Sequence, residues 1–297
     1  MLVLHRTEER WEDRRFVEFP SFLKQGDCLV LNDSRVIPSR LYGQRRGLSG
    51  RIEVLLLQPV SEDQREWKAL VRPGRKLAVG DVVEFEGAKA EITGRGEFGE
   101  RTLRFQGDVE EQLERIGHVP LPPYIRRSDE AVDKERYQTV FARAKGSVAA
   151  PTAGLHFTTG ILEQCRAAGA EIAHVTMHVG LGTFQPLHGD RLHAERYEIT
   201  PENEAKIRAA SRRVAIGTTS VRTIESGGSK GETDLFIRPG FEFRMTNGML
   251  TNFHLPKTSL LLLVCAFAGS EFVLSAYRHA VQQTYRFYSY GDCMLII

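Results

Sequence analysis

The chain has 297 residues, with 40 Lys and Arg against 38 Asp and Glu, and its net charge is +2. So small an excess does not identify a nucleic-acid-binding protein by total charge, and any basic surface must be local. With 41% hydrophobic and 26% charged residues, the composition is typical of a globular protein, and the length of 297 residues suggests roughly two domains. The longest apolar run, residues 260–268, is well short of the ~20 residues of a membrane helix, so a cytoplasmic protein without a membrane segment is expected.

The four cysteines lie far apart in the chain. They occupy positions 28, 165, 265 and 293, and no two of them form a Cys-x-x-Cys pair. Such spacing is more typical of reduced, buried thiols in a cytosolic protein than of a disulfide framework or a zinc site. The sequence therefore predicts neither a metal nor a redox cofactor.

A short apolar strand is predicted over residues 28–31, and it ends in Asn32-Asp33-Ser34-Arg35. These polar side chains bond readily to nearby backbone, so a capped turn without function and a ligand-binding turn both fit the stretch. Arg35 also begins an arginine-rich strip that could contact phosphates, made up of Arg35, Arg40, Arg45, Arg46 and Arg51. A solvated loop face explains this strip nearly as well.

Residues 50–107 have a different texture, with short β-type segments separated by Gly, Pro and charged turns. This spacing without helical runs predicts a small barrel or sandwich. A Pro-rich link at residues 119–127 is extended by its prolines, and we interpret it as the return to the first domain. The predicted organisation is an α/β catalytic domain at residues 1–46 and 120–297, interrupted by an inserted β-barrel domain at residues 47–119.

The stretch 147–184 carries two polar turns at the two ends of one helix–strand unit. Thr158 is expected to cap a helix whose apolar residues recur with helical spacing, and Gly169 is expected to end it. Residues 171–179 then predict a buried strand. Because ligands in open α/β sheets bind outside the carboxyl ends of strands, the turn after this strand is a candidate ligand site.

That turn is Gly180-Leu181-Gly182-Thr183, in which two glycines permit a tight reversal and a close approach of backbone amides to a ligand. His156 precedes the helix and His178 precedes the turn, so one pocket could receive both. A metal pair of His174 and His178 is disfavoured, because residues four apart on a strand are separated by about 13 Å. The alternative interpretation is a tight turn that binds no ligand.

Further along the chain, a strand over residues 213–217 is followed by Thr218-Thr219-Ser220, which opens a second helix. The pair Asn247-Gly248 predicts a hairpin between residues 241–245 and 249–253. Strands separated by helices imply a largely parallel sheet. We therefore predict an α/β fold, with a three-layer α/β/α domain around a mainly parallel sheet.

Seven segments of the chain, in order, resemble the signature segments of the S-adenosylmethionine:tRNA ribosyltransferase-isomerase family of queuosine biosynthesis. They read NDSRVIPSRL, GSVAAPTAGLHFT, HVGLGTFQP, HAERYEI, GTTSVRTIES, LTNFHLPKTSLLLLVCAFAG and YRFYSYGDCMLI, and they extend over nearly the whole chain. No GxSxG elbow, phosphate-binding P-loop or GxGxxG motif after a strand is present, so the residues alone do not name a reaction.

The resemblance implies that the ribosyl group of S-adenosylmethionine is transferred and isomerised onto 7-aminomethyl-7-deazaguanine at the wobble position of tRNA. The products would be epoxyqueuosine-tRNA, adenine and methionine. S-adenosylmethionine is then a consumed co-substrate, no cofactor is needed, and the partner is a tRNA carrying the aminomethyl-deazaguanine base. A monomer in the cytoplasm is expected.

For this reaction we expect the donor to lie between the turns at residues 32–35, 180–184 and 218–222. The candidates for proton transfer are His156, Asp33 and Glu195. The expected substrate-binding residues are Asn32, Arg35, Thr152, His178, Gly180, Gly182, Thr183, Phe184, Thr219, Ser220, Arg222, Asn252, His254 and Lys257. Phe184 could stack on adenine, and Arg222 or the Thr219 and Ser220 hydroxyls could hold the methionine carboxylate. Each side chain has an alternative role in capping or turn formation.

Two departures from the family pattern are expected to matter. Family members usually begin with an additional segment that contains an ELP-type strand and an arginine-bearing loop, whereas this sequence starts at what would be the next strand. The stretches 186–193 and 210–213 also look shortened. A real truncation would remove part of the sheet. Two other functions fit the sequence: a catalytically silent tRNA-binding module and an ordinary S-adenosylmethionine methyltransferase.

Overall fold

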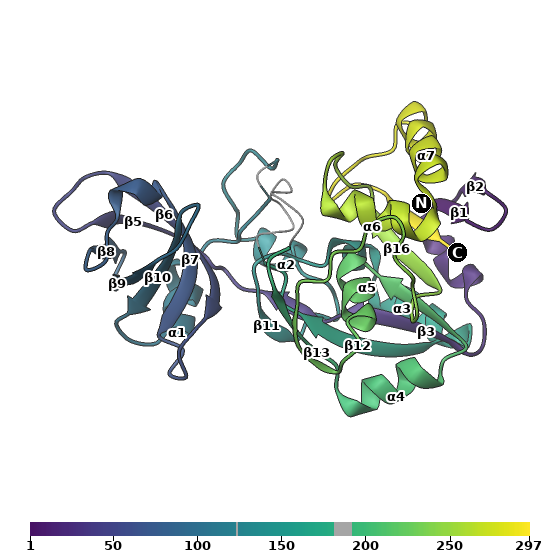
Figure 1. Ribbon diagram of the computed structural model, residues 1–297, viewed down its shortest axis with the longest axis horizontal. Helices are drawn as coiled ribbons and strands as arrows, with labels where there is room; N and C mark the ends of the chain where they lie inside the picture. The colour runs from purple at the N-terminus through teal and green to yellow at the C-terminus, as the bar shows by residue number, and fades with distance from the viewer. Residues whose placement is uncertain (123, 181–191) are drawn as a thin grey trace. The chain divides into compact units, whose positions relative to one another are not determined.

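The computed structural model describes residues 1–122, 124–180 and 192–297, which form two compact units (Figure 1). The large unit comprises Met1–Arg35, Gln138–Ala144 and Ala150–Ile297, and the small unit comprises Val36–Tyr137 and Lys145–Ala149. The predicted insertion, residues 47–119, lies within the small unit. Two short strands at the chain crossings, β4 (Ser34–Val36) and β11 (Ala144–Ser147), pair as a two-stranded sheet.

The large unit contains a nine-stranded sheet. In spatial order its strands are β15 (Lys230–Thr233), β13 (Glu195–Glu198), β12 (Glu171–Met177), β3 (Asp27–Asn32), β14 (Arg212–Ile216), β16 (Gly248–Asn252), β17 (Cys293–Ile296), β1 (Leu2–His5) and β2 (Arg10–Asp13). Among the described strands, the parallel pairings are β12 with β3, β3 with β14, β14 with β16, and β1 with β17. The other pairings are antiparallel, so the sheet is mixed and the prediction of a mainly parallel sheet is corrected.

The central parallel strands are apolar because packed side chains cover both of their faces. All residues of β3 are buried, and their side chains alternate between two apolar clusters. Cys28 and Val30 belong to the cluster that includes residues of α4 (Pro201–Ala209), α5 (Thr218–Glu225), α6 (Ser259–Ala268) and α7 (Ser270–Gln282). Leu29 and Leu31 belong to the cluster with η1 (Phe16–Phe22), η3 (Thr152–His156) and α3 (Thr159–Ala167). Packing on both faces thus holds the ends of these strands in place.

The predicted helix caps are confirmed. The Thr158 side chain accepts a hydrogen bond from the amide of Ile161 at the start of α3, and Gly169 follows the helix with a φ of +90°. A hydroxyl also caps α4 at Thr200, where Pro201 is the first helical residue. These signals are local, which is why the sequence alone was enough to locate the helix starts.

The predicted hairpin at Asn247-Gly248 is wrong. Residues 241–245 form no strand, and β16 instead pairs in parallel with β14 and antiparallel with β17. The Asn247 side chain accepts a hydrogen bond from the amide of Arg213 at 2.9 Å, so the turn residue anchors the start of β14. An Asn-Gly pair permits a hairpin turn but does not require one, and here the sheet supplied other partners.

The small unit is built on a closed barrel of six strands, as the texture of residues 50–107 predicted. In spatial order these are β10 (Glu100–Phe105), β7 (Glu66–Arg72), β6 (Arg51–Pro59), β5 (Arg40–Arg45), β8 (Val82–Phe85) and β9 (Ala88–Arg95). Alternate residues point inward, among them Leu41, Val54 and Leu103, which are fully buried. The unit also contains η2 (Gly74–Lys76), α1 (Val109–Ile116) and α2 (Asp133–Arg136), and the side chain of Asp108 caps α1.

Within the described ranges, no single helix is long and apolar enough to cross a membrane. The helices α6 and α7 reach that length and hydropathy only as a pair, and they meet at an angle of 113°.

Candidate functional site

Asn32 joins strand ends at the carboxyl edge of the parallel strands. Its Nδ2 donates to the carbonyl of Met177 at 3.0 Å and to Oγ1 of Thr219 at 3.3 Å. Its Oδ1 accepts from the amide of Met177 at 3.0 Å and from that of Ser34 at 3.1 Å. The residue is almost completely buried. The Asn32 amide therefore braces the turn after β3 against the end of β12 and the start of α5.

Asp33, the next residue, is a buried carboxylate with partners on both oxygens. Oδ1 accepts a hydrogen bond from the hydroxyl of Thr176 at 2.6 Å, and Oδ2 lies 3.2 Å from Nη2 of Arg143. The backbone around it is also held, because the amide of Arg143 donates to the Asp33 carbonyl at 2.7 Å. The residues around Asp33 in the sequence do not point to Thr176 or Arg143 as its partners, because both lie more than 100 positions away in the chain.

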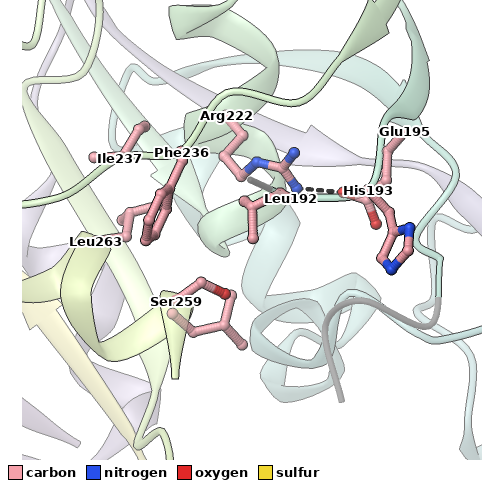
Figure 2. A pocket seen from close by; sticks show the side chains of 9 residues that line it. Leu192, His193, Glu195, Arg222, Phe236, Ile237, Ser259 and Leu263 are labelled. Atoms are coloured by element: carbon pink, nitrogen blue, oxygen red, sulfur yellow. Dashed lines mark hydrogen bonds and ion pairs between the residues drawn. The ribbon is translucent and has the colours of Figure 1, made fainter. Parts of the chain in front are cut away.

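Glu195, on β13, forms a buried ion pair with Arg222 of α5 (Figure 2). Its second oxygen, Oε1, accepts a hydrogen bond from the amide of Gly180 at 2.7 Å. Arg222 further donates to the carbonyls of Leu235 at 3.1 Å and Thr233 at 3.2 Å. Arg222 and Gly180 were both predicted to contact the donor, but here both donate to Glu195.

A pocket lies against this ion pair, and Figure 2 shows the residues around it. Its wall is mostly apolar, and it is lined by Leu192, His193, Glu195, Arg222, Phe236, Ile237, Ser259, Leu260 and Leu263. Most of these residues come from α6 and from the segment after β15, which sequence analysis did not include in the site. Nothing in the local pattern of those apolar residues distinguishes a pocket wall from an ordinary core.

The amino end of α5 also lies at the carboxyl edge, directly after β14. Gly217 precedes it with a φ of +89°, a conformation that glycine adopts without strain, and no side chain caps the helix. Ser220, whose hydroxyl was expected to hold the methionine carboxylate, instead donates from that hydroxyl to the carbonyl of Ile216 at 2.8 Å. Thr219 keeps its hydroxyl near Asn32, beside the uncapped amides of the first turn.

Two buried polar atoms at this edge, Nε2 of His156 and Oδ1 of Asn252, make no hydrogen bond of standard geometry within the described residues. The Nδ2 of Asn252 is held by the carbonyls of Tyr288 at 2.9 Å and Ser289 at 3.3 Å, which fixes the direction of the amide. Burial lowers the pKa of His156, and the Asn252 amide opposes that shift. The His156 ring also contacts that of Phe16, with centroids 5.2 Å apart. This imidazole is therefore neutral near pH 7 and can accept a proton.

The other predicted histidines have different environments. Burial lowers the pKa of His178, with a further contribution from Arg196, and its Nδ1 has no partner among the described residues. Burial lowers the pKa of His254 to about 4, and its Nε2 lies 2.7 Å from the hydroxyl of Thr251. Lys257, in the loop before α6, is exposed and has a φ of +61°. His254 is thus a neutral side chain held within the loop rather than a charged donor.

The remaining predicted residues are spread over the same edge or lie outside the described chain. Thr152 begins η3 and is partly buried, and Arg35 is exposed. Gly182, Thr183 and Phe184 lie outside the described residues. The carboxyl edge accordingly brings together the turns at residues 32–35 and 218–222, the amide of Gly180, and the pair of His156 and Asn252.

Much of the positive charge of the arginine-rich strip is paired with acidic side chains, which its sequence did not indicate. Three of its members form ion pairs at 2.7 to 3.3 Å, namely Arg40 with Glu53, Arg45 with Asp81, and Arg46 with Glu84. Arg51 lies over the ring of Tyr42, 3.9 Å from its centroid. The acids that balance these arginines are distant in sequence, on β6 and β8, or just before β8.

All four cysteines are free and buried. Burial raises the pKa of the Cys28 and Cys165 thiols to about 11 and that of Cys293 to about 12, so these thiols stay protonated and unreactive near pH 7. Across the described ranges, no group of three or more His, Cys, Asp or Glu side chains is placed to hold a metal ion.

Comparison with known proteins shows which family the chain belongs to. A family model described as "Queuosine biosynthesis protein" matches residues 1–296. The chain is 61% identical to a protein of Solibacter usitatus and 46% identical to one of Thermotoga petrophila, both named S-adenosylmethionine:tRNA ribosyltransferase-isomerase. Each alignment covers 100% of this chain and 92% of the relative. A crystal structure of S-adenosylmethionine tRNA ribosyltransferase from Thermotoga maritima is similar over 100% of this chain and 91% of that one, with 38% identity and a TM-score of 0.54.

Proposed function

The chain belongs to the family of queuosine biosynthesis proteins, and from this premise we propose that it is an S-adenosylmethionine:tRNA ribosyltransferase-isomerase. It transfers and isomerises the ribosyl group of S-adenosylmethionine onto 7-aminomethyl-7-deazaguanine at the tRNA wobble position. The products are epoxyqueuosine-tRNA, adenine and methionine. The observation that carries the proposal is the 61% identity to a relative of that name over the whole of this chain.

The reaction sets requirements that the site must meet. The sulfonium acidifies the adjacent ribose C–H, a base removes that proton, and adenine leaves as an acid protonates it. The amine of the deazaguanine base then attacks the sugar, and loss of methionine closes the epoxide. These steps require one group that accepts a proton, one that donates a proton near adenine, and donors for the methionine carboxylate.

We assign proton transfer to His156 ahead of the two carboxylates. Its imidazole is neutral because burial lowers its pKa, although the neighbouring Asn252 amide opposes the shift, and Nε2 makes no hydrogen bond of standard geometry within the described residues. Asp33 and Glu195 are each already engaged with an arginine. A carboxylate beside a cation is a weaker base than a neutral imidazole at pH 7. Asp33 then fixes the guanidinium of Arg143 at the carboxyl edge, and Glu195 fixes the backbone at Gly180 by accepting its amide hydrogen bond.

The methionine end of the donor is placed against α5. The uncapped amino end of that helix and the hydroxyl of Thr219 offer hydrogen-bond donors to a carboxylate. Arg222 is a less suitable partner, because Glu195 already balances its charge. The apolar wall of the pocket in Figure 2, including Phe236 and Leu263, suits the uncharged part of the methionine chain.

Product analysis tests the proposal. Incubation of the protein with S-adenosylmethionine and tRNA bearing the aminomethyl-deazaguanine base should release adenine and methionine in equal amounts. Binding of tRNA without any release would indicate a silent tRNA-binding module. Formation of S-adenosylhomocysteine would instead indicate a methyltransferase.

The protein needs no metal and no redox cofactor, and it acts as a monomer in the cytoplasm. Its large unit is a three-layer α/β/α domain, which is supported by the two apolar clusters that share alternate residues of β3. The inserted domain corresponds to the small unit, whose barrel also includes β5 (Arg40–Arg45), ahead of the predicted limit at residue 47.

A further inference from the structure

A polar depression of about 500 Å³ lies along β12 in the large unit, outside the site described above. Its wall includes Arg143, Arg166 near the end of α3, and Lys206 of α4. The ring of His174 also lines it, and the backbone amide of His174 donates to Oδ1 of Asn203 at 2.8 Å. Two guanidinium groups and an ammonium group therefore surround a hollow large enough for a phosphate group and its sugar.

The charge of this depression is positive overall. It holds three cations against the two acids Glu171 and Glu202. Glu202 pairs with Lys206 at 2.7 Å, but its side chain is 77% exposed, and such a surface pair is weak and easily exchanged. The guanidinium of Arg166 has no hydrogen-bond or ion-pair partner among the described residues, so it is available to an anion.

The cations are close enough to one another to act together. All three lie near enough to His174 to affect its pKa. Burial has the largest lowering effect on that pKa, Arg143, Lys206 and Arg166 lower it further, and Asp33 raises it. A neutral imidazole and two guanidiniums offer several N–H donors to phosphate oxygens, and arginine in particular matches phosphate geometry.

Arg143 links this depression to the carboxyl edge. Its guanidinium lines the depression, and its Nη2 lies 3.2 Å from Asp33 at the end of β3. An anionic chain that follows the depression would thus arrive beside the candidate site. The arginine-rich strip is less suited to this role, because three of its members are paired with acids.

We propose that the depression between α4, β12 and the end of α3 binds phosphate groups of the tRNA strand next to the nucleotide that is modified. This inference rests on the proposed function, since it assigns a contact surface to the tRNA substrate. The depression acts in substrate binding and takes no part in the chemistry at the ribose.

The first test compares Arg166→Gln, Lys206→Gln and the double variant with the wild-type protein. Each single change should weaken tRNA binding roughly three- to tenfold, as expected when one charge-assisted hydrogen bond at an exposed site is removed. The slope of log affinity against log salt should become shallower by about 0.7 to 1 for each cation removed. The KM for tRNA should rise, while the KM for S-adenosylmethionine and the turnover at saturating tRNA should stay unchanged.

Arg208→Gln is the matched control. Arg208 is also an exposed arginine on α4, paired with Glu204, but it does not line the depression. It should change neither affinity nor slope. Unchanged affinity and slope in the double variant, with an active wild-type protein, would overturn the inference. A wild-type protein that releases no adenine would instead count against the proposed function, and the two failures are therefore distinguishable.

A second measurement uses the unaltered protein and so does not depend on whether the variants fold. The pKa of His174 is followed by NMR titration with and without a short single-stranded RNA that carries the anticodon-loop sequence. A phosphate bound in the depression should raise that pKa, since it partly cancels the effect of Arg143, Lys206 and Arg166. An unchanged His174 pKa in the presence of bound RNA would contradict the proposal.

Discussion

Glu195 and Arg222 form a buried ion pair in which one carboxylate serves two partners. One oxygen accepts from the guanidinium, and the other accepts from the amide of Gly180 at 2.7 Å. Arg222 in turn bonds the carbonyls of Thr233 and Leu235. The pair therefore joins α5, β13, the end of β15 and the chain after β12. Both members of the pair line the pocket in Figure 2.

Removal of one member of this pair should destabilise the protein strongly. Glu195→Ala leaves the Arg222 charge buried without its partner, and we expect the free energy of unfolding to fall by about 3–5 kcal/mol. Denaturant titration measures this change. Glu198→Ala on the same strand is the control, because Glu198 pairs with Lys230 at the exposed surface and should cost less than about 1 kcal/mol. If the free energy of unfolding fell equally in the two variants, the buried pair would contribute no more to stability than the exposed one.

His156→Gln should remove most of the activity. If His156 transfers the proton, turnover should fall by roughly 10²- to 10⁴-fold, while binding of S-adenosylmethionine remains close to that of the wild type. Adenine release and calorimetry give the two quantities. The control is His118→Gln, a histidine of the small unit paired with Asp129, which should retain turnover. A large loss of thermal stability in His156→Gln, with turnover kept by the folded fraction, would make His156 structural.

The pH dependence of turnover should reflect the lowered pKa of His156. Burial keeps this pKa below the ordinary value of 6.5, so the basic form persists to lower pH. Turnover should therefore fall on acidification with a midpoint below pH 6.5, as His156 becomes protonated. A pH–rate profile of adenine release checks this. A midpoint above the ordinary histidine value of 6.5 would indicate another group.

Stability should also depend on pH through His254. Burial lowers its pKa to about 4 from 6.5, so between these values the unfolded chain binds a proton that the folded protein does not. The stabilisation is complete above pH 6.5 and is lost progressively as the pH falls toward 4. Denaturation midpoints across this range should fall less steeply for His254→Gln than for the wild type. Parallel curves would mean that His254 does not contribute.

Chelation should leave activity unchanged. The histidines at 174 and 178 are too far apart along one extended stretch to share a metal ion, and the four cysteines are buried and apart, so we expect no metal in the reaction. The protein is treated with a chelator, dialysed, and assayed for adenine release. Loss of activity that zinc restores would show that the metal-free interpretation is wrong.

Local features of the chain could be predicted from the sequence, because their causes lie within a few residues. Thr158 caps α3 by accepting from an amide three positions ahead, and Gly169 ends the helix region where φ is positive. The short strands between turns in residues 50–107 similarly indicated a barrel. The order of motifs along the chain indicated the family, since motif order is itself a property of sequence.

The pairing of side chains and the direction of the outer strands were decided only by the tertiary structure. Asp33 meets Arg143, and Glu195 meets Arg222, because the sheet order places β3, β12, β14 and their connections side by side. A sequence pattern shows that a carboxylate is polar, but not which distant cation will balance it. The same holds for Asn247-Gly248. Its preference for a hairpin turn is not realised, because β16 pairs with β14 and β17 instead. Long-range hydrogen bonds and burial outweigh local preference there, because an unpaired buried group costs more than a turn conformation stabilises.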